Sequence, residues 1–179
     1  MKKLFTILGI ITSTLCLAQE PKTGNPKDNL MIYGEGFMFS LKEPSGWTVD
    51  VDNAAKYNAN VIFYANKNDM DKGGALVQAQ AFSKNDENTI EDLKYDIASY
   101  KRDYPTLKEQ NLEAKHKNYK TFSKLIYVDN KFFQYITYIN PGTKYHNGIS
   151  VAMNISKRQA TDKELLAYRQ IINSLIMIK

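Results

Sequence analysis

The segment 120–156 limits the possible folds more than any other, because its apolar side chains recur with the period of a β-strand. In its last part, Ile149, Val151, Met153 and Ile155 alternate with Ser150, Ala152, Asn154 and Ser156. Such alternation predicts a strand with one face in a core. Two strand-like runs precede it, 120–128 and 132–139, and the Asp129-Asn130 pair between them is compatible with a tight hairpin turn. The segment therefore predicts a meander of antiparallel strands.

Two segments with helical spacing flank this meander. In the first, the apolar face is formed by Ile90, Leu93, Ile97, Tyr100 and Tyr104. In the second it is formed by Leu165, Tyr168, Ile172 and Leu175. Each begins like a capping box, with Thr89 and Thr161 placed to accept a free backbone N–H. Pro105 is expected to end the first helix.

The N-terminal half carries shorter strand signals. Residues 31–33 and 37–41 lie on either side of a glycine turn, and Pro44-Ser45-Gly46 stops the second run. Residues 61–65 and 75–82 predict another strand pair, joined by the polar loop 66–74. Strands joined by short turns and covered by helices predict an α+β domain over residues 30–179, with a central, mainly antiparallel sheet flanked by helices.

The first residues predict export. Lys2 and Lys3 precede an apolar run, Leu4–Leu15, which is too short to span a bilayer. We expect a signal peptide over residues 1–18, cleaved after Ala18, and a flexible leader over residues 19–29. Lipidation of Cys16 and an uncleaved anchor are the alternatives; the bulky Leu15 disfavours lipidation. The mature chain is expected in the periplasm or outside the cell, without a transmembrane helix.

Cleavage changes the charge and the cysteine content. The formal charge of +5 includes Lys2 and Lys3, so the mature chain has 22 basic and 19 acidic side chains, a charge of +3. That excess is too small and too evenly spread to indicate nucleic-acid binding. Cys16 is the only cysteine. The mature chain therefore has no disulfide, and we expect an ordinary hydrophobic core to hold it together.

Signatures of catalysis and metal binding are missing from the sequence. It has no Gly-x-Ser-x-Gly, no phosphate-binding glycine loop and no His-Glu-x-x-His. His116 and His146 lie in polar, turn-like segments, and we expect both to be solvated. The loop 66–74 departs from the EF-hand order at Met70. We predict no catalytic, cofactor-binding or metal-binding residue and a chain that is not an enzyme.

The candidate interaction surface consists of basic and aromatic residues. Its members are Lys115, Lys117, Tyr119, Lys120, Lys124, Tyr135 and Tyr138. The lysines suit an anionic lipid head group, a glycan or an acidic partner protein, but lysines also keep a sheet edge soluble, which is the interpretation we favour. The strand tyrosines either form an exposed contact surface or lie under the helices; we favour the second.

Trp47, the only tryptophan, follows the Pro44-Ser45-Gly46 turn. It is either an aromatic binding platform or a side chain that folds back over the end of the sheet. We favour the second interpretation, because burying a tryptophan contributes more free energy than displaying it. Replacing it is therefore expected to reduce stability before it reduces binding.

One local motif and the order of elements together resemble a known family. The motif is Pro-x-Gly-Trp at the end of an early strand, and the chain closes with a helix ending in Ile171-Ile172-Asn173-Ser174-Leu175. These features are similar to the PsbP-like families, which include DcrB-like envelope proteins, over about residues 30–178. The resemblance implies a PsbP-like α/β/α sandwich and a non-catalytic role in docking onto, or assembling, another protein. It transfers no site residues.

Three hypotheses of function follow. We favour an exported, non-enzymatic accessory domain that docks onto, or assists, an envelope or secreted protein partner. The second hypothesis is the binding of a small apolar or glycan ligand between the sheet and the first helix. The third is a hydrolase that uses a pair of carboxylates; the first helix carries Glu91, Asp92, Asp96 and Asp103, for which a solvated, salt-bridged surface is the default interpretation. No cofactor is expected.

Overall fold

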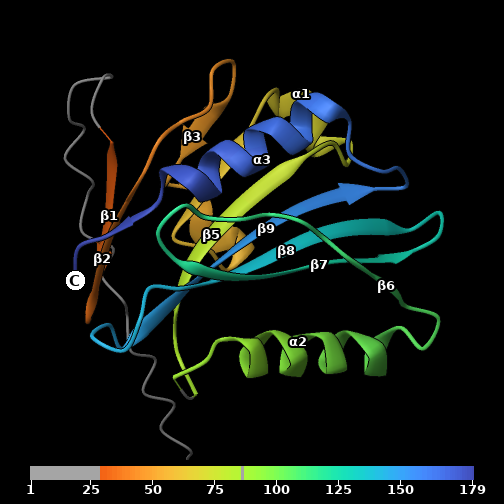
Figure 1. Cartoon of the computed structure of the whole chain (residues 1–179). Helices are drawn as coiled ribbons and strands as arrows, with labels where there is room; N and C mark the ends of the chain where they lie inside the picture. Colours follow the sequence, from red (N-terminus) through yellow and green to blue (C-terminus); the bar gives the residue numbers. More distant parts are fainter. Residues whose placement is uncertain (1–28, 86) are drawn as a thin grey trace, which may run out of the picture.

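Two antiparallel sheets and three α-helices form an α+β fold over residues 29–85 and 87–179, the part of the chain that the computed structural model describes (Figure 1). The expected signal peptide, its cleavage site after Ala18 and Cys16 all lie outside these residues. Within them, no helix is long and apolar enough to span a membrane.

The larger sheet has seven strands in the order β3-β4-β5-β9-β8-β7-β6. Their bounds are β3 Thr48–Asp50, β4 Val61–Tyr64, β5 Leu76–Ser83, β6 Lys108–Asn111, β7 Lys120–Val128, β8 Phe132–Asn140 and β9 Asn147–Ser156. The predicted meander is confirmed as β7, β8 and β9. The hairpin loop between β7 and β8 has three residues, 129–131, because Val128 pairs with Phe132; Asn130 takes a left-handed conformation there, with φ 59°.

The smaller sheet joins the two ends of the described chain. It has the order β1-β2-β10, where β1 is Leu30–Gly34, β2 is Phe37–Leu41 and β10 is Ile176–Met177. The early hairpin is confirmed, and Gly36 supports its turn with φ +78°. Strand β10 was not expected, because the helical pattern continued to Leu175. It pairs with β2, which places the C-terminus beside the first hairpin (Figure 1).

Two long helices cover the larger sheet, α2 (Ile90–Asp103) and α3 (Asp162–Ser174). Helix α3 begins with the predicted capping box, in which the N–H of Glu164 lies 3.3 Å from Thr161 Oγ1. The cap expected at Thr89 is wrong, because this residue has φ −61° and ψ 1° rather than the extended backbone of a capping residue. Its side chain is buried instead.

The polar loop expected at 66–74 is partly helical. It forms the short helix α1 (Lys67–Asp71), preceded along the chain by a 3₁₀ helix, η1 (Ala54–Tyr57). Asn66 caps α1, because its Oδ1 accepts from the N–H of Asn68 at 2.8 Å. This helix buries Met70 against Ile62 and Leu76, which gives the loop an apolar contact that its composition did not indicate.

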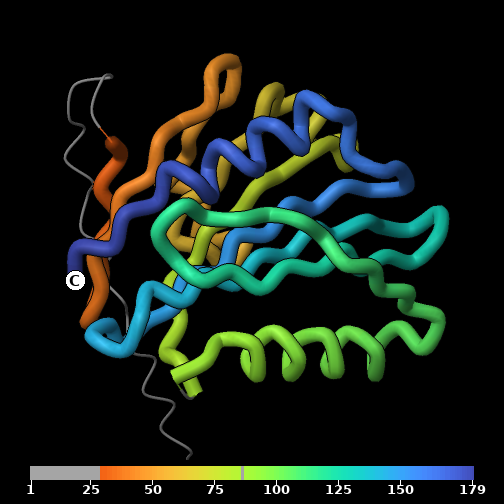
Figure 2. Tube along the Cα trace, in the orientation of Figure 1, coloured from red at the N-terminus to blue at the C-terminus, as the bar shows by residue number. Residues whose placement is uncertain are grey.

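The two long helices lie on opposite faces of the larger sheet (Figures 1 and 2). On one face, the main core includes Tyr168 and Ile171 of α3, and the Tyr168 hydroxyl lies 2.8 Å from Thr137 Oγ1 of β8. On the other face, Leu93 and Ile97 of α2 pack on β7 and β8. Strand β8 is consequently buried on both faces, as strands covered by helices on both sides are.

His116 is buried, so the expectation of a solvated loop histidine is wrong for this residue. Its side chain is 7% exposed. Its Nδ1 accepts from the backbone N–H groups of Asn118 at 2.9 Å and Tyr119 at 3.0 Å, and its Nε2 donates to the backbone oxygen of Leu175 at 2.9 Å. The sequence around it is polar, but this segment lies against the end of α3. His146 is exposed.

Trp47 is half-buried and packs against the main core. Its backbone N–H donates to the oxygen of Pro44 at 3.0 Å, and Gly46 has φ +77°, so the turn forms as expected. The side chain therefore belongs to the packing of the sheet and is not displayed as an open platform.

Candidate binding grooves beside helix α2

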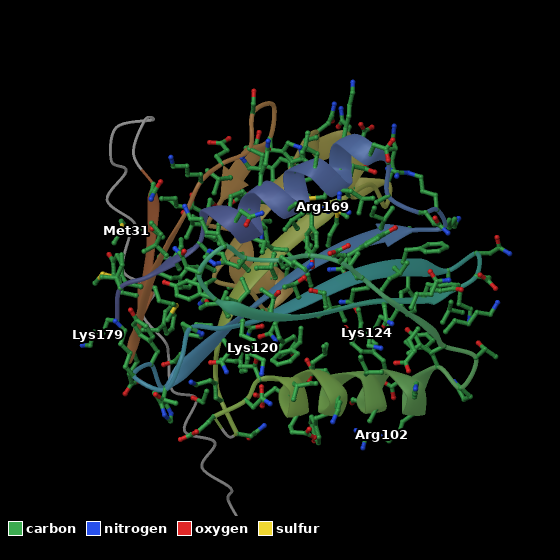
Figure 3. The ribbon with its side chains drawn as sticks, in the orientation of Figure 1. Met31, Arg102, Lys120, Lys124, Arg169 and Lys179 are labelled. Atoms are coloured by element: carbon green, nitrogen blue, oxygen red, sulfur yellow. The ribbon has the colours of Figure 1, made fainter. Side chains whose placement is uncertain are left out.

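The candidate residues between positions 115 and 124 do not form one surface. Lys115 is exposed and makes an ion pair with Glu113 at 2.6 Å. Lys117 lies beside the end of α3. Lys120 and Lys124 lie on β7, on the side of the sheet that α2 covers (Figure 3). Tyr119 stacks on His116 with ring centroids 4.5 Å apart, and its hydroxyl accepts from the N–H of Met177.

The two candidate tyrosines, both on β8, are buried, so they cannot form an exposed contact surface. Tyr135 is 4% exposed and Tyr138 is 6% exposed. The Tyr135 hydroxyl accepts from the N–H of Ala160 at 3.0 Å, on the α3 side. The Tyr138 hydroxyl donates to a carboxylate oxygen of Asp96 on α2, and burial raises the pKa of this tyrosine. The helices cover both faces of β8, as the favoured interpretation expected.

The strand register determines which side chains lie next to one another on the face of the larger sheet that α2 covers. Side chains from β5, β9, β8 and β7 stand in rows across this face, and the pairing defines three of them: Leu76–Asn154–Gln134–Ile126, Gln78–Ala152–Ile136–Lys124 and Gln80–Ser150–Tyr138–Phe122. Apart from Leu76, the residues of these rows on β5 and β9 are polar or small, while β7 presents Ile126, Phe122 and Lys124. Helix α2 packs on β7 and β8, so parts of these rows extend past the helix on either side of it.

On the β7 side of α2 lies an open groove of about 560 Å³, which we call the lysine-rimmed groove. Its apolar lining includes Leu93, Ile97 and Phe122. Its polar and charged lining includes Lys94, Lys101, Glu109 and Lys124, and Lys120 lies beside it with Nζ 5.0 Å from the ring centre of Phe122. The groove therefore combines an apolar floor with a predominantly basic rim.

On the β9 side of α2 lies a second hollow of about 380 Å³, which we call the polar cleft. Its floor comes from β5, β9 and β8, one wall from α2 and the other from the end of η1 and the residue that follows it. The lining residues are Tyr57, Asn58, Gln78, Gln80, Asp96, Tyr100, Gln134, Ile136, Tyr138, Ser150, Ala152 and Asn154. Four of them carry side-chain amides on the sheet, which makes this surface rich in groups that both donate and accept hydrogen bonds.

The polar cleft was not predicted, although the sequence carried one signal for it. The polar phase of the 149–156 alternation consists of Ser150, Ala152 and Asn154, which are small for the middle of a broad sheet. Small side chains on a central strand leave space that larger neighbours do not fill. The sequence did not show which strands flank β9, so the amides of Gln78 and Gln134 could not be placed beside it.

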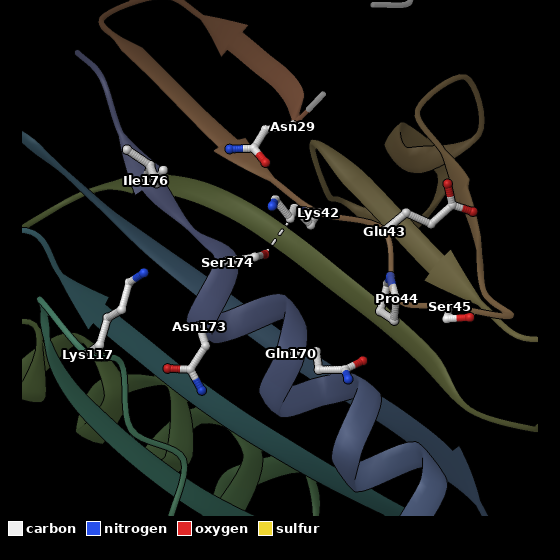
Figure 4. A pocket seen from close by; sticks show the side chains of 10 residues that line it. All are labelled: Asn29, Lys42, Glu43, Pro44, Ser45, Lys117, Gln170, Asn173, Ser174 and Ile176. Atoms are coloured by element: carbon white, nitrogen blue, oxygen red, sulfur yellow. Dashed lines mark hydrogen bonds between the residues drawn. The ribbon is translucent and has the colours of Figure 1, made fainter. Parts of the chain in front are cut away.

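A third hollow, of about 510 Å³, lies between the end of α3 and the segment after β2 (Figure 4). It contains Lys117 and part of the Pro44-Ser45 turn. The N–H of Lys42 donates to Ser174 Oγ at 3.0 Å across it. Its charged members, Lys42, Glu43 and Lys117, are all exposed, so it does not hold a charged group away from water.

Carboxylates are sparse in these hollows, and each hollow has one among its lining residues: Glu43, Asp96 or Glu109. Within residues 29–85 and 87–179, no group of three or more His, Cys, Asp or Glu side chains is placed to hold a metal ion. Asp96 is the carboxylate that lines the polar cleft, and it accepts from Tyr138. Asp92 is buried nearby on α2 and accepts from Asn85.

Comparison with protein-family models and with curated proteins found no match for this chain. The resemblance to the PsbP-like families rests on the Pro-x-Gly-Trp motif and the order of elements, and it stays a prediction.

Proposed function

We propose that this chain is an exported, non-enzymatic accessory domain of PsbP-like type that docks onto a partner protein through the lysine-rimmed groove. The observation that carries the proposal is the pairing of an apolar floor with lysines whose charge is not balanced locally. The partner that fits this surface is an acidic, amphipathic segment. Export and membership of the PsbP-like families are parts of the same proposal.

The charges around the groove distinguish two kinds of lysine. Lys94 and Lys101 have carboxylate partners, Glu91 at 2.7 Å and Glu109 at 3.6 Å. Lys124 instead donates to Asn111 Oδ1 at 3.0 Å, and within the described residues it forms no ion pair. The same holds for Lys120, which lies over the Phe122 ring. These two lysines give the groove a local positive charge that acidic side chains of a partner would complement.

The openness of the groove favours a polypeptide over a small apolar molecule. A small-ligand pocket typically buries at least about 70% of its ligand. The groove instead lies open between α2 and β7, and its apolar strip follows Leu93 and Ile97 along the helix. An amphipathic helix can place its apolar side chains along such a strip and leave its acidic face to the lysines.

A designed acidic, amphipathic peptide can stand in for the partner in a test of this proposal. The probe has about 14 residues, with leucines at helical spacing and glutamates elsewhere, and its control has the same composition in scrambled order. Fluorescence anisotropy measures binding at about 50 mM and about 300 mM NaCl. We expect the ordered peptide to bind more tightly than the scrambled one, and the difference to shrink at the higher salt concentration.

Charge-reversing substitutions inside and outside the groove distinguish peptide binding at the groove from non-specific electrostatic attraction between the protein and the acidic peptide. The Lys120→Glu/Lys124→Glu double variant should weaken binding about tenfold or more. The control, Lys144→Glu/Lys163→Glu, changes the net charge equally, and Lys144 also lies over an aromatic ring, that of Tyr145. Equal weakening by both double variants, or equal binding of ordered and scrambled peptides, would contradict the proposal.

A further inference from the structure

Gln134 has a buried oxygen without a hydrogen-bond partner, and it lies in the polar cleft. The residue is 8% exposed on the central strand β8. Its Nε2 donates to the Tyr100 hydroxyl at 3.1 Å, but within the described residues its Oε1 accepts no hydrogen bond. Leaving such a buried acceptor unpaired costs about 1–3 kcal/mol. The oxygen is shielded from solvent beneath the lining of the cleft, so a donor of a bound molecule would supply the missing hydrogen bond once the side-chain amide turns toward the cleft.

Neighbouring amides are held in position by hydrogen bonds that leave other atoms available. Gln78 Nε2 donates to the backbone oxygen of Tyr57 at 2.7 Å, and Asn154 Nδ2 donates to Gln78 Oε1 at 2.6 Å. Within the described residues, Asn154 Oδ1 and the side-chain amide of Gln80 make no hydrogen bond. The cleft thus presents an acceptor from Asn154 and a complete amide from Gln80, beside the shielded, unpaired oxygen of Gln134.

The charge of the cleft selects for a neutral ligand. No lysine, arginine or histidine is among its lining residues, so nothing there would balance an anion. Its carboxylate, Asp96, accepts a hydrogen bond from Tyr138 and has lone pairs left to accept from a hydroxyl group of a ligand. Hydroxyl groups, in contrast, donate and accept as amides do, so a polyhydroxylated molecule matches the floor.

The walls and size of the cleft suit a sugar ring. Half-buried tyrosines stand on two sides, Tyr57 from η1 and Tyr100 from α2, and each combines an apolar ring with a polar hydroxyl. Ala152 lies on the floor of the cleft, and its short side chain leaves space for a ligand. The volume of about 380 Å³ lies in the range of about 300–1,000 Å³ typical of small-ligand sites.

We infer that the polar cleft binds a neutral, hydroxyl-rich small molecule of the monosaccharide or disaccharide class. Gln80, Gln134 and Asn154 bind its hydroxyls, and the tyrosines pack on its C–H faces. The inference does not rest on the lysine-rimmed groove, which lies on the other side of α2.

The test uses the mature protein and a panel of neutral sugars: glucose, galactose, mannose, N-acetylglucosamine, maltose and cellobiose. Each is titrated to about 10 mM, and ¹H–¹⁵N NMR follows the side-chain amide signals. We expect at least one sugar to shift the signals of Gln80, Gln134 and Asn154 in a saturable way. If no sugar produces saturable shifts, the cleft holds ordered water only and the inference is overturned.

Two variants locate the binding. Ala152→Leu fills the floor of the cleft and should abolish the shifts; if it does not fold, Gln80→Leu at the rim should weaken binding about tenfold. The matched control is Ala98→Trp, at an exposed position of α2 that lines the lysine-rimmed groove. It fills that groove and should leave sugar binding unchanged while abolishing peptide binding. Sugar binding that survives in a folded Ala152→Leu protein, or that Gln80→Leu leaves unweakened, would overturn the inference. The peptide result is independent of it.

Discussion

Nε2 of His116 lies 2.9 Å from the backbone oxygen of Leu175, so a hydrogen bond joins the segment before β7 to the end of α3. The ring can make this bond and accept the N–H groups of Asn118 and Tyr119 only when it is neutral, with its proton on Nε2. Burial lowers the pKa of His116, and the charge of Lys117 lowers it further, while the bond to Leu175 opposes them.

We predict that the free energy of unfolding falls as the pH falls below about 6.5, the ordinary pKa of histidine. Below that value the unfolded chain binds a proton at His116 before the folded protein does, so protonation favours unfolding. The loss continues until the pH reaches the lowered pKa of the folded state. Urea unfolding at about pH 7.5, 6.5 and 5.5 measures it. His116→Gln should flatten this dependence, and His146→Gln, at an exposed position, should not.

Trp47→Ala should destabilise the protein by about 1–3 kcal/mol, because the half-buried side chain packs against the main core. Chemical denaturation followed by circular dichroism measures the change. Thr48→Ala, at the neighbouring exposed position, is the control and should alter stability by less than about 0.5 kcal/mol. An unchanged melting temperature for Trp47→Ala would restore the interpretation of this residue as a binding platform.

Tyr138→Phe should loosen the attachment of α2 to β8. The substitution removes the hydroxyl that donates to Asp96 and leaves that half-buried carboxylate without its partner, at a cost of about 1–3 kcal/mol. Hydrogen exchange should show reduced protection of α2 while β9 stays protected. Tyr95→Phe on the same helix is the control, because Tyr95 is 67% exposed. Equal effects of both variants would contradict this role of the bond.

Gln134→Leu should change sugar binding without reducing the stability of the protein. The variant removes the unpaired buried oxygen, and the Tyr100 hydroxyl that loses its donor is on a half-buried residue that water can reach. We expect the free energy of unfolding to stay the same or to rise by about 1 kcal/mol, while sugar binding is lost. A variant that is strongly destabilised would show instead that Gln134 serves the fold.

Local sequence specified those features that depend on neighbouring residues. The alternation at 149–156 predicted a strand, the early glycine turn a hairpin, and Thr161 with Glu164 a capping box, and all three are confirmed, because periodicity and capping involve residues a few positions apart. The α+β class followed from the order of these elements. Thr89 shows that a local pattern can also mislead. Its position predicted the capping residue of α2, but its side chain is buried and makes no capping hydrogen bond.

The surfaces that the chain offers depend instead on its tertiary structure. His116 is buried because Leu175, 59 residues away, meets it, and Tyr135 and Tyr138 are buried because both faces of β8 are covered. The polar cleft exists because β5 and β8 flank β9, which brings Gln78 and Gln134 to either side of small residues. Burial and pairing of this kind depend on contacts between distant segments. A residue's immediate neighbours in the sequence do not specify such contacts.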